Sequence, residues 1–353
     1  VRQRDLQEVQ RIADRCTVKV PARHRFVETR QVQGAILIHE DQRIVGHGVD
    51  LAFQHASHIL QRVQARAHHD RRRAQAVRLL RRTFRRVQVA IRIAAHEGAA
   101  PQQVIHERRD APLPFVPGME GSGVVLAVGE GVDAGRVGQS VRFSNKGGAL
   151  AERIRVPAAQ AWPTLARHDF AQSASWHVGA ITAYVGLVRL GALARGQTVL
   201  VHGATGGMGY AAIQLARHLG ATVHATARDP SDRERTAPLL AAGAQSILPS
   251  SGFREAVLDA TAGRGVDLVF DPVGGDVFDE SLRVVAFGGK LLVIGFASGR
   301  IPTVAANIPL IKGFSVVGVR AGEFGRRFPE LGAENLREVA CLGEAGVFDP
   351  LIG

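Results

Sequence analysis

The most constraining feature of this sequence is a glycine-rich turn between a predicted strand and a predicted helix. The apolar run 198–202 is followed at once by Gly-Ala-Thr-Gly-Gly-Met-Gly over 203–209, and a small apolar helix follows. The first glycine, Gly203, permits a tight turn, and the last, Gly209, lets the helix pack against the strand. Between them, Gly206 and Gly207 let backbone amides approach a diphosphate at a helix N-terminus, where N–H groups are free and the helix dipole is positive. The pattern predicts a dinucleotide site, and the alternative is an ordinary glycine-rich turn.

Five more apolar strands are predicted after this turn, and helices separate most of them. We expect strands at 222–226, 245–248, 266–270, 290–294 and 314–319, and helices at 210–219, 232–242, 253–262 and 277–286. Pro238 is an irregularity inside the second of these helices. Continuous apolar strands that alternate with helices indicate a doubly wound α/β fold with a parallel sheet. A helical stretch over 171–190 precedes them, so we expect this domain to span 171–319.

The residue that follows the second strand distinguishes between the two nicotinamide dinucleotides. A carboxylate there accepts a hydrogen bond from the ribose 2′-hydroxyl of NAD, whereas an arginine suits the 2′-phosphate of NADP. Arg228 occupies the predicted position, and Asp229 follows it, so a shift of one residue would reverse the assignment. We expect NADPH rather than NADH.

Upstream of this domain, short β-branched runs and turns predict a small β-rich unit over 111–170. Strands are expected at 123–129 and 141–143, with a turn at 131–135. The chain has only 2 cysteines, which are far apart, so a disulfide framework is excluded and a reducing cytoplasm is expected. No apolar run approaches the roughly 20 residues that a membrane-spanning helix needs.

Residues 1–110 differ from the rest in composition. They hold 22 of the 44 Lys and Arg residues but only 11 of the 32 acidic residues and 4 of the 40 glycines. The spacing of the apolar residues predicts a helix with one apolar face, and arginines surround that face. The residues are Val77, Leu80, Phe84, Val87 and Ile91. Such a segment could bind nucleic acid or an anionic membrane surface. It could also be a solvated arginine-rich helix, or a non-native translation of a GC-rich gene in the wrong frame; its character is left open.

Four stretches together resemble the zinc-independent quinone oxidoreductases of the medium-chain dehydrogenase/reductase superfamily. They are Pro-Gly-Met-Glu-Gly-Ser-Gly at 117–123, Ile-Thr-Ala-Tyr at 181–184, Phe-Asp-Pro-Val-Gly-Gly at 270–275, and the long run 288–299, together with the turn itself. The resemblance is expected over 111–353 and not over 1–110. It implies a GroES-like β-rich catalytic domain joined to a Rossmann NADP-binding domain.

The resemblance also implies contacts with the cofactor. Thr182 and the segment Ile294, Gly295 and Phe296 would lie near the nicotinamide, and Ser250 near the adenosine, although each could simply pack. The expected cofactor-binding residues are therefore Thr182, Gly203, Gly206, Gly207, Met208, Gly209, Arg228, Ser250, Ile294, Gly295 and Phe296.

No metal is expected. Met119 stands where zinc-dependent relatives carry a histidine, and the four clustered cysteines of their structural zinc site are missing. The histidine pairs His55/His58 and His68/His69 offer too few ligands for a metal site. The implied reaction is hydride transfer from NADPH to a quinone, or to the β-carbon of an α,β-unsaturated carbonyl as in an enoyl reductase. No catalytic residue is nominated, because water could supply the proton.

The sequence departs from the family at both ends. Family members usually begin with strands of the catalytic domain and continue beyond a segment like 346–353, so we expect an incomplete GroES-like domain. Residues 320–353 would be the start of a truncated return to it, and activity could be impaired. A homodimer that pairs through the sixth strand is implied. The alternatives are a cofactor-binding protein without turnover and, less favoured, nucleic-acid binding through the basic segment 1–110.

Overall fold

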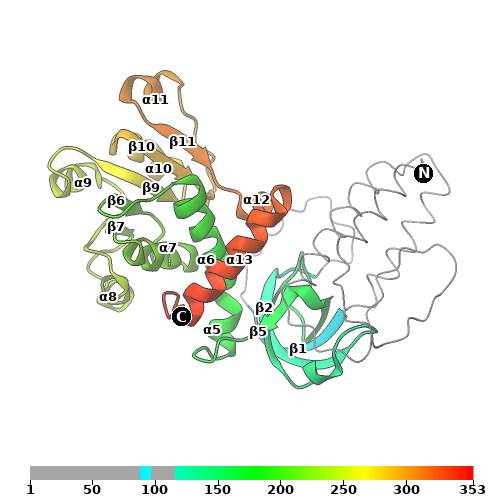
Figure 1. Ribbon diagram of the computed structural model, residues 1–353. Helices are drawn as coiled ribbons and strands as arrows, with labels where there is room; N and C mark the ends of the chain where they lie inside the picture. The colour runs from blue at the N-terminus through cyan, green and yellow to red at the C-terminus, as the bar shows by residue number, and fades with distance from the viewer. Residues whose placement is uncertain (1–87, 97–115, 353) are drawn as a thin grey trace, which may run out of the picture. The chain divides into compact units, whose positions relative to one another are not determined.

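The computed structural model describes residues 88–96 and 116–352 (Figure 1). These residues fall into two compact units. One contains residues 88–92, 124–139 and 153–162, and the other contains 93–96, 116–123, 140–152 and 163–352. Predictions that fall on 1–87 and 97–115, including both histidine pairs, lie outside the described residues.

A five-stranded sheet is built from the first strands of the chain. They are β1 (Gln88–His96), β2 (Glu120–Val128), β3 (Ser140–Ser144), β4 (Arg153–Pro157) and β5 (Ala161–Pro163), in the order β4-β1-β2-β3-β5. Short 3₁₀ turns η1 (Ala134–Arg136) and η2 (Ala158–Gln160) lie between them. The two strands predicted from sequence correspond to β2 and β3. In the first unit, the buried core is formed by Ile91, Val125, Ile154, Val156 and Ala161.

The predicted helix face from Val77 to Ile91 is wrong at its C-terminal end. Ile91 lies in β1, fully buried, and is paired with Ile154 of the antiparallel strand β4. In the sequence, the apolar residues Val89, Ile91 and Ile93 also recur with the period of two that a strand has, and cross-strand pairing overrides the helical spacing. Residues 1–110 therefore do contribute a strand to the β-rich sheet, contrary to expectation.

The second sheet has six strands in the order β11-β10-β9-β6-β7-β8. The strands are β6 (Thr198–Val201), β7 (Thr222–Ala227), β8 (Ser246–Pro249), β9 (Val266–Asp271), β10 (Val285–Val293) and β11 (Ser315–Gly318). Each neighbouring pair is parallel. The chain runs from β6 outward to β8 and then returns to place β9 on the other side of β6. This reversal confirms the predicted doubly wound fold.

Helices cover both faces of this sheet (Figure 1). One face packs against α6 (His177–Tyr184), α7 (Gly207–His218), α8 (Arg233–Ala242) and α13 (Pro329–Glu344). The opposite face packs against α9 (Arg254–Ala260) and α10 (Gly275–Ser281). Alternate residues of the central strands, such as Leu200 and Val201, enter opposite cores, because side chains alternate along a strand. Pro238 lies inside α8, as expected.

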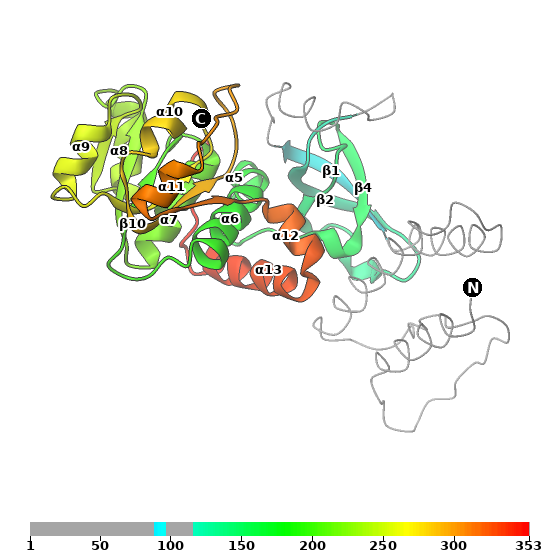
Figure 2. The same ribbon diagram turned by 90° about the horizontal axis from the view of Figure 1, so that it is seen from above.

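The helical stretch predicted over 171–190 is divided into three parts. They are α5 (Phe170–Ser175), α6 and a π-helical turn η3 (Val185–Leu190). Two further helices follow the sixth strand: α12 (Ala321–Arg327) and α13, which lies beside α6 in both views (Figure 2). None of the helices in the described part of the chain is long and apolar enough to cross a membrane.

The prediction of a helix over 277–286 is wrong beyond Ser281. The chain leaves α10 there, and β10 already begins at Val285. The pairing register between β9 and β10 shifts between Val285 and Lys290, where two consecutive glycines interrupt the strand. Val284 and Val285 are buried, and a short buried apolar run does not by itself distinguish a helix from a strand. The helix α11 (Asn307–Lys312) was not predicted.

Candidate functional site

The glycine-rich turn connects the end of β6 to the start of α7, as the sequence predicts. Gly203 has a φ of +58°, in the left-handed region that favours glycine. A Cβ on Gly209 would lie 2.3 Å from the carbonyl oxygen of Gly203. These two glycines are therefore required by the protein's own backbone, because α7 begins directly against the turn.

Gly206 has a different role, since the protein itself leaves space beside it. Its backbone is extended, with φ −96° and ψ 159°, and an added Cβ would meet Gly203 O alone within 4 Å, at 3.4 Å. Tyr210 N donates to Gly206 O at 2.9 Å, so the amides of 207–209 precede the hydrogen bonds of the helix and point out of its N-terminus. A row of helix-start amides that begins at exposed Gly207, with space beside Gly206, fits an anionic group such as a diphosphate.

Met208 contributes its amide rather than its side chain to this row. The side chain is half-buried and packs against the core on the α6 and α7 face of the sheet. A diphosphate would therefore meet backbone donors over 207–209, and no side-chain cation is needed in the turn.

The other predicted cofactor-binding residues lie at the same edge of the sheet. Arg228 follows β7, Ser250 follows β8, and the segment 294–296 follows β10. Because all six strands are parallel, their carboxyl ends meet at one edge, and the chain reversal between β6 and β9 lies in the middle of it. In the order of the strands, Ser250 and Arg228 stand on one side of the turn and 294–296 on the other. This order suits an elongated ligand that crosses the turn.

The side chains of Arg228 and Asp229 differ in the hydrogen bonds that they make to the protein. Arg228 is exposed immediately after β7. The Oδ1 atom of Asp229 accepts from the backbone N–H of Ser231 at 2.9 Å and from its hydroxyl at 2.6 Å. These hydrogen bonds lower the pKa of the Asp229 carboxyl. Asp229 is thus committed to a local turn.

Asp271 connects the ends of β9 and β10 through its backbone and side chain. Its carbonyl oxygen accepts from the N–H groups of Ile294 and Gly295 at 2.9 and 3.4 Å. Its Oδ1 accepts from the N–H groups of Val273 and Gly274 at 2.8 and 2.9 Å. Burial raises the pKa of this carboxyl, and the two amides oppose the shift. Oδ2 is buried without a hydrogen-bond partner among the described residues.

His202 lies fully buried directly before the turn and joins three elements. Its Nδ1 lies 2.9 Å from Thr226 Oγ1 of β7, and its Nε2 lies 2.9 Å from Ser281 Oγ of α10. The Ser281 hydroxyl donates to Val277 O at 2.7 Å, so it accepts from His202 Nε2–H, and Nδ1 accepts from Thr226. Burial lowers the pKa of His202 to about 3. The ring is therefore neutral, and it fixes the ends of β6 and β7 beneath the turn.

Thr182 is buried on α6, and this helix lies against the start of α7. A Cβ on Gly179 would lie 3.2 Å from Gly207 O, so the two helices approach closely at the turn. The N-terminus of α6 is held by Glu120, whose Oε2 accepts from Val178 N at 3.0 Å. Met119, one residue before, is 40% exposed.

A buried cation stabilises the same region. Arg142 Nη1 lies 2.9 Å from His177 Nδ1, and its guanidinium is 4.9 Å from the centre of the Trp176 ring. Burial lowers the pKa of Arg142 to about 10, against the charges of Glu344 and Glu120. Burial, together with the charge of Arg142, lowers the pKa of His177 to about 3. His177 is neutral, and its Nδ1 accepts from the guanidinium.

Sequence reasoning missed His202, Asp271, Arg142 and His177 as members of this region. Asp271 is the last residue of β9, and His202 directly follows β6. Both therefore lie at the carboxyl edge of the sheet, and their position in the sequence could have indicated this. Arg142 and His177 carried no local signal, because their pairing joins residues 35 positions apart. In the described part of the chain, no three His, Cys, Asp or Glu side chains gather as metal ligands would.

Two family models match the sequence. The alcohol dehydrogenase GroES-like domain matches residues 85–166, and the zinc-binding dehydrogenase family matches 207–337. The first match begins before β1, so the resemblance extends further toward the N-terminus than the expected boundary at 111.

Individual proteins are similar over most of the chain. A quinone oxidoreductase-like protein 2 homolog from Nematostella vectensis is 34% identical over 255 residues, which are 71% of this chain and 69% of that protein. A mycobacterial protein solved in complex with NADPH has 30% identity and a TM-score of 0.66, covering 76% of this chain and 83% of its own. Escherichia coli quinone oxidoreductase, also solved with NADPH, has 25% identity and a TM-score of 0.65 over the same shares.

Proposed function

The chain belongs to the quinone oxidoreductase family of the medium-chain dehydrogenase/reductase superfamily, and on this premise we propose that it is an NADPH-dependent oxidoreductase. Its acceptor is a quinone or an α,β-unsaturated carbonyl compound, and the reaction needs no metal. The observation that carries the proposal is the turn at 203–209. There, the first amides of α7 begin at exposed Gly207, next to the space beside Gly206, which fits a dinucleotide diphosphate.

The remaining contacts follow from the order of the strands. With the diphosphate at the turn, the adenosine half lies toward β7 and β8, where Arg228 pairs with the 2′-phosphate and Ser250 lies near the adenosine. The nicotinamide half lies toward β9 and β10, where Ile294, Gly295 and Phe296 line its pocket. Asp271 holds this segment by accepting from the amides of Ile294 and Gly295.

Catalysis in this site is mainly positioning. Bound NADPH supplies the hydride. The chain holds the diphosphate with backbone donors, fixes the turn through His202, and presents the apolar side chains of Ile294 and Phe296, which exclude water from the reacting face. We nominate no protein acid, because water can protonate the reduced product. A metal-free reaction is supported by Met119, whose thioether does not replace an imidazole ligand of zinc.

The function is tested with the full chain by following NADPH fluorescence and absorbance. We expect quenching or enhancement on binding, and oxidation of NADPH that depends on added 1,4-benzoquinone or an enone. Binding without oxidation by either acceptor would support the alternative of a cofactor-binding protein without turnover. Absence of binding at millimolar NADPH would overturn the proposal. The predicted cytoplasmic location stays a prediction.

Cofactor preference is tested at Arg228. Removal of its charge-assisted hydrogen bond to the 2′-phosphate costs about 1.5–3 kcal/mol, so Arg228→Ala should weaken NADPH binding roughly ten- to a hundredfold and leave NADH binding unchanged. The matched control is Arg233→Ala, which removes a different exposed arginine, at the start of α8. Equal affinities of wild type for the two cofactors would contradict the assignment.

A homodimer through β11 is also proposed. Within the described sheet β11 is an edge strand, and nearby Phe287, Ile301, Leu310 and Ile311 are 87%, 72%, 80% and 74% exposed. Exposed apolar side chains beside an open strand edge favour pairing with a second copy. Light scattering should give twice the chain mass for wild type and the single mass for Ile311→Glu; a monomeric wild type at micromolar concentration would refute the dimer.

A further inference from the structure

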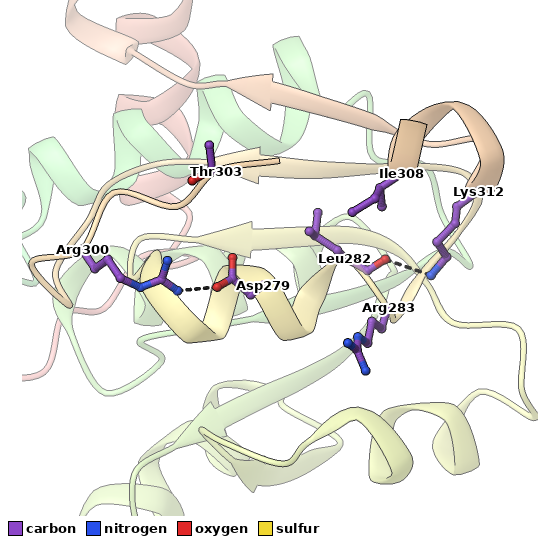
Figure 3. A pocket seen from close by; sticks show the side chains of 7 residues that line it. All are labelled: Asp279, Leu282, Arg283, Arg300, Thr303, Ile308 and Lys312. Atoms are coloured by element: carbon purple, nitrogen blue, oxygen red, sulfur yellow. Dashed lines mark hydrogen bonds and ion pairs between the residues drawn. The ribbon is translucent and has the colours of Figure 1, made fainter. Parts of the chain in front are cut away.

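A cavity of about 450 Å³ lies away from the glycine-rich turn. Its lining comes from α10 and the turn after it, from the segment that follows β10, and from α11: Asp279, Leu282, Arg283, Arg300, Thr303, Ile308 and Lys312 (Figure 3). None of these residues belongs to the proposed cofactor contacts. The volume is in the range of small-molecule sites.

One end of the cavity holds one cation and two carboxylates, a net charge of −1. Arg300 donates to Asp276 at 2.8 Å and also pairs with Asp279 (Figure 3). Both carboxylates come from α10. An arginine with two carboxylate partners has little tendency to attract a further anion, so we place no anionic group at this end.

The opposite end carries an excess of positive charge. Lys312 Nζ donates to Leu282 O at 2.8 Å, and its ammonium retains two further donors for other acceptors. Burial, and then the neighbouring charges of Arg254 and Arg283, lower the pKa of Lys312, and no carboxylate is among the groups that affect it. We call Arg254, Arg283 and Lys312 the cation end: Arg283 and Lys312 line the cavity, and the charge of Arg254 acts on Lys312 from outside the lining.

The carboxylate of Glu280, outside the lining, is engaged by backbone: it accepts from the N–H groups of Gly252 and Arg254 at 2.9 and 2.8 Å. Within the lining, Arg283 and Lys312 give this end an excess of two positive charges. A phosphate monoester carries about −1.5 to −2 at pH 7 and offers three acceptor oxygens, which matches this excess better than a carboxylate or a neutral group.

The wall between the two ends is apolar. Leu282 and Ile308 point toward each other between Arg300 and Lys312 (Figure 3), and Ile308 packs against the core under α9 and α10. We propose that this cavity binds a small organic phosphate monoester, with its phosphate at the cation end and its apolar part on Leu282 and Ile308. The site is separate from the one proposed for the dinucleotide.

The test is calorimetric titration of phenyl phosphate into the full chain, with and without saturating NADPH, at pH 7.5 and low salt. Loss of one charge-assisted contact weakens binding about tenfold, so we expect that effect from Lys312→Gln and from Arg283→Gln. Arg283 is exposed, so its variant should fold even where that of Lys312 does not. The matched control Arg337→Gln, at an exposed arginine of α13, should bind as wild type does.

Three results would overturn the proposal. Unchanged affinity of Arg283→Gln and Lys312→Gln for phenyl phosphate would show that the cation end does not bind the phosphate. Equal binding of phenol would show that the phosphate is not recognised. Loss of phenyl phosphate binding when NADPH is present would place the ligand at the turn instead. The comparison without NADPH stands even if the proposed cofactor does not bind, so the two proposals fail independently.

Discussion

The glycine-rich turn and the cation end attract anions by different physical means. At the turn, the donors are amides of 207–209, fixed by the helix and by the close contact between Gly209 and Gly203. At the cation end, the donors that line the cavity are the side chains of Arg283 and Lys312, which stand on flexible stems. The first region has donors fixed in direction before a ligand arrives, whereas the second has net charge but less fixed geometry.

This difference indicates how each region should respond to change. A preformed row of amides is sensitive to an added methyl group and insensitive to the removal of any one charge. A cluster of cations is sensitive to charge removal and to salt, because exposed charges are screened.

The largest effect is expected at Gly209. In Gly209→Val the Cβ would lie 2.3 Å from Gly203 O, and relief of such overpacking costs about 3 kcal/mol of unfolding free energy. Urea unfolding followed by circular dichroism measures this loss. Unchanged stability would show that the turn is not rigid, and the contrast would fail. Gly322→Val, at an exposed glycine in the first turn of α12 with nothing within 4 Å of an added Cβ, is the control.

A smaller effect is expected from pH, through His202 beneath the turn. Its pKa is about 3 in the folded protein and about 6.5 when unfolded. Between these values the unfolded chain binds a proton that the folded chain does not, so stability falls as the pH is lowered. From pH 7 to 5 this ring should cost about 2 kcal/mol.

The variant His202→Gln isolates this contribution. It should be less stable than wild type at pH 7 but should lose less stability between pH 7 and 5, while His177, whose pKa is also about 3, contributes equally to both. An identical pH dependence in the two proteins would contradict a buried neutral His202.

The smallest effect on the fold is expected at Gly206. Its extended backbone accepts alanine, so Gly206→Ala should change the unfolding free energy by less than about 0.5 kcal/mol. The new methyl group would occupy the space before the amides, and NADPH affinity should fall about tenfold. Phenyl phosphate should bind this variant as it binds wild type. Calorimetry measures both ligands, and unchanged NADPH affinity would place the diphosphate elsewhere.

The turn could be predicted from sequence because its determinants are local. Strand, glycines and helix are consecutive, and the parallel strands that follow place Arg228, Ser250 and 294–296 at one edge by a general rule. Element ends were less predictable. The start of β10 at Val285 depends on its pairing with Val266 of β9, which no local pattern reveals.

Long-range pairing also explains what was missed elsewhere. The strand around Ile91 is fixed by β4, more than 50 residues further along the chain, so a helical spacing was misleading there. The cation end joins α9, α10 and α11, and α11 itself was not predicted. Side chains that meet only through tertiary structure, such as Arg142 and His177, carry no signal in the sequence alone.

The central claim is that a dinucleotide diphosphate lies against the first amides of α7, and hydrogen exchange at single-residue resolution tests it directly. With saturating NADPH, the amides of Gly207, Met208 and Gly209 should exchange more slowly, whereas phenyl phosphate that fills the cation end should leave them unchanged. Bound NADPH with unaltered exchange at all three amides would contradict the account.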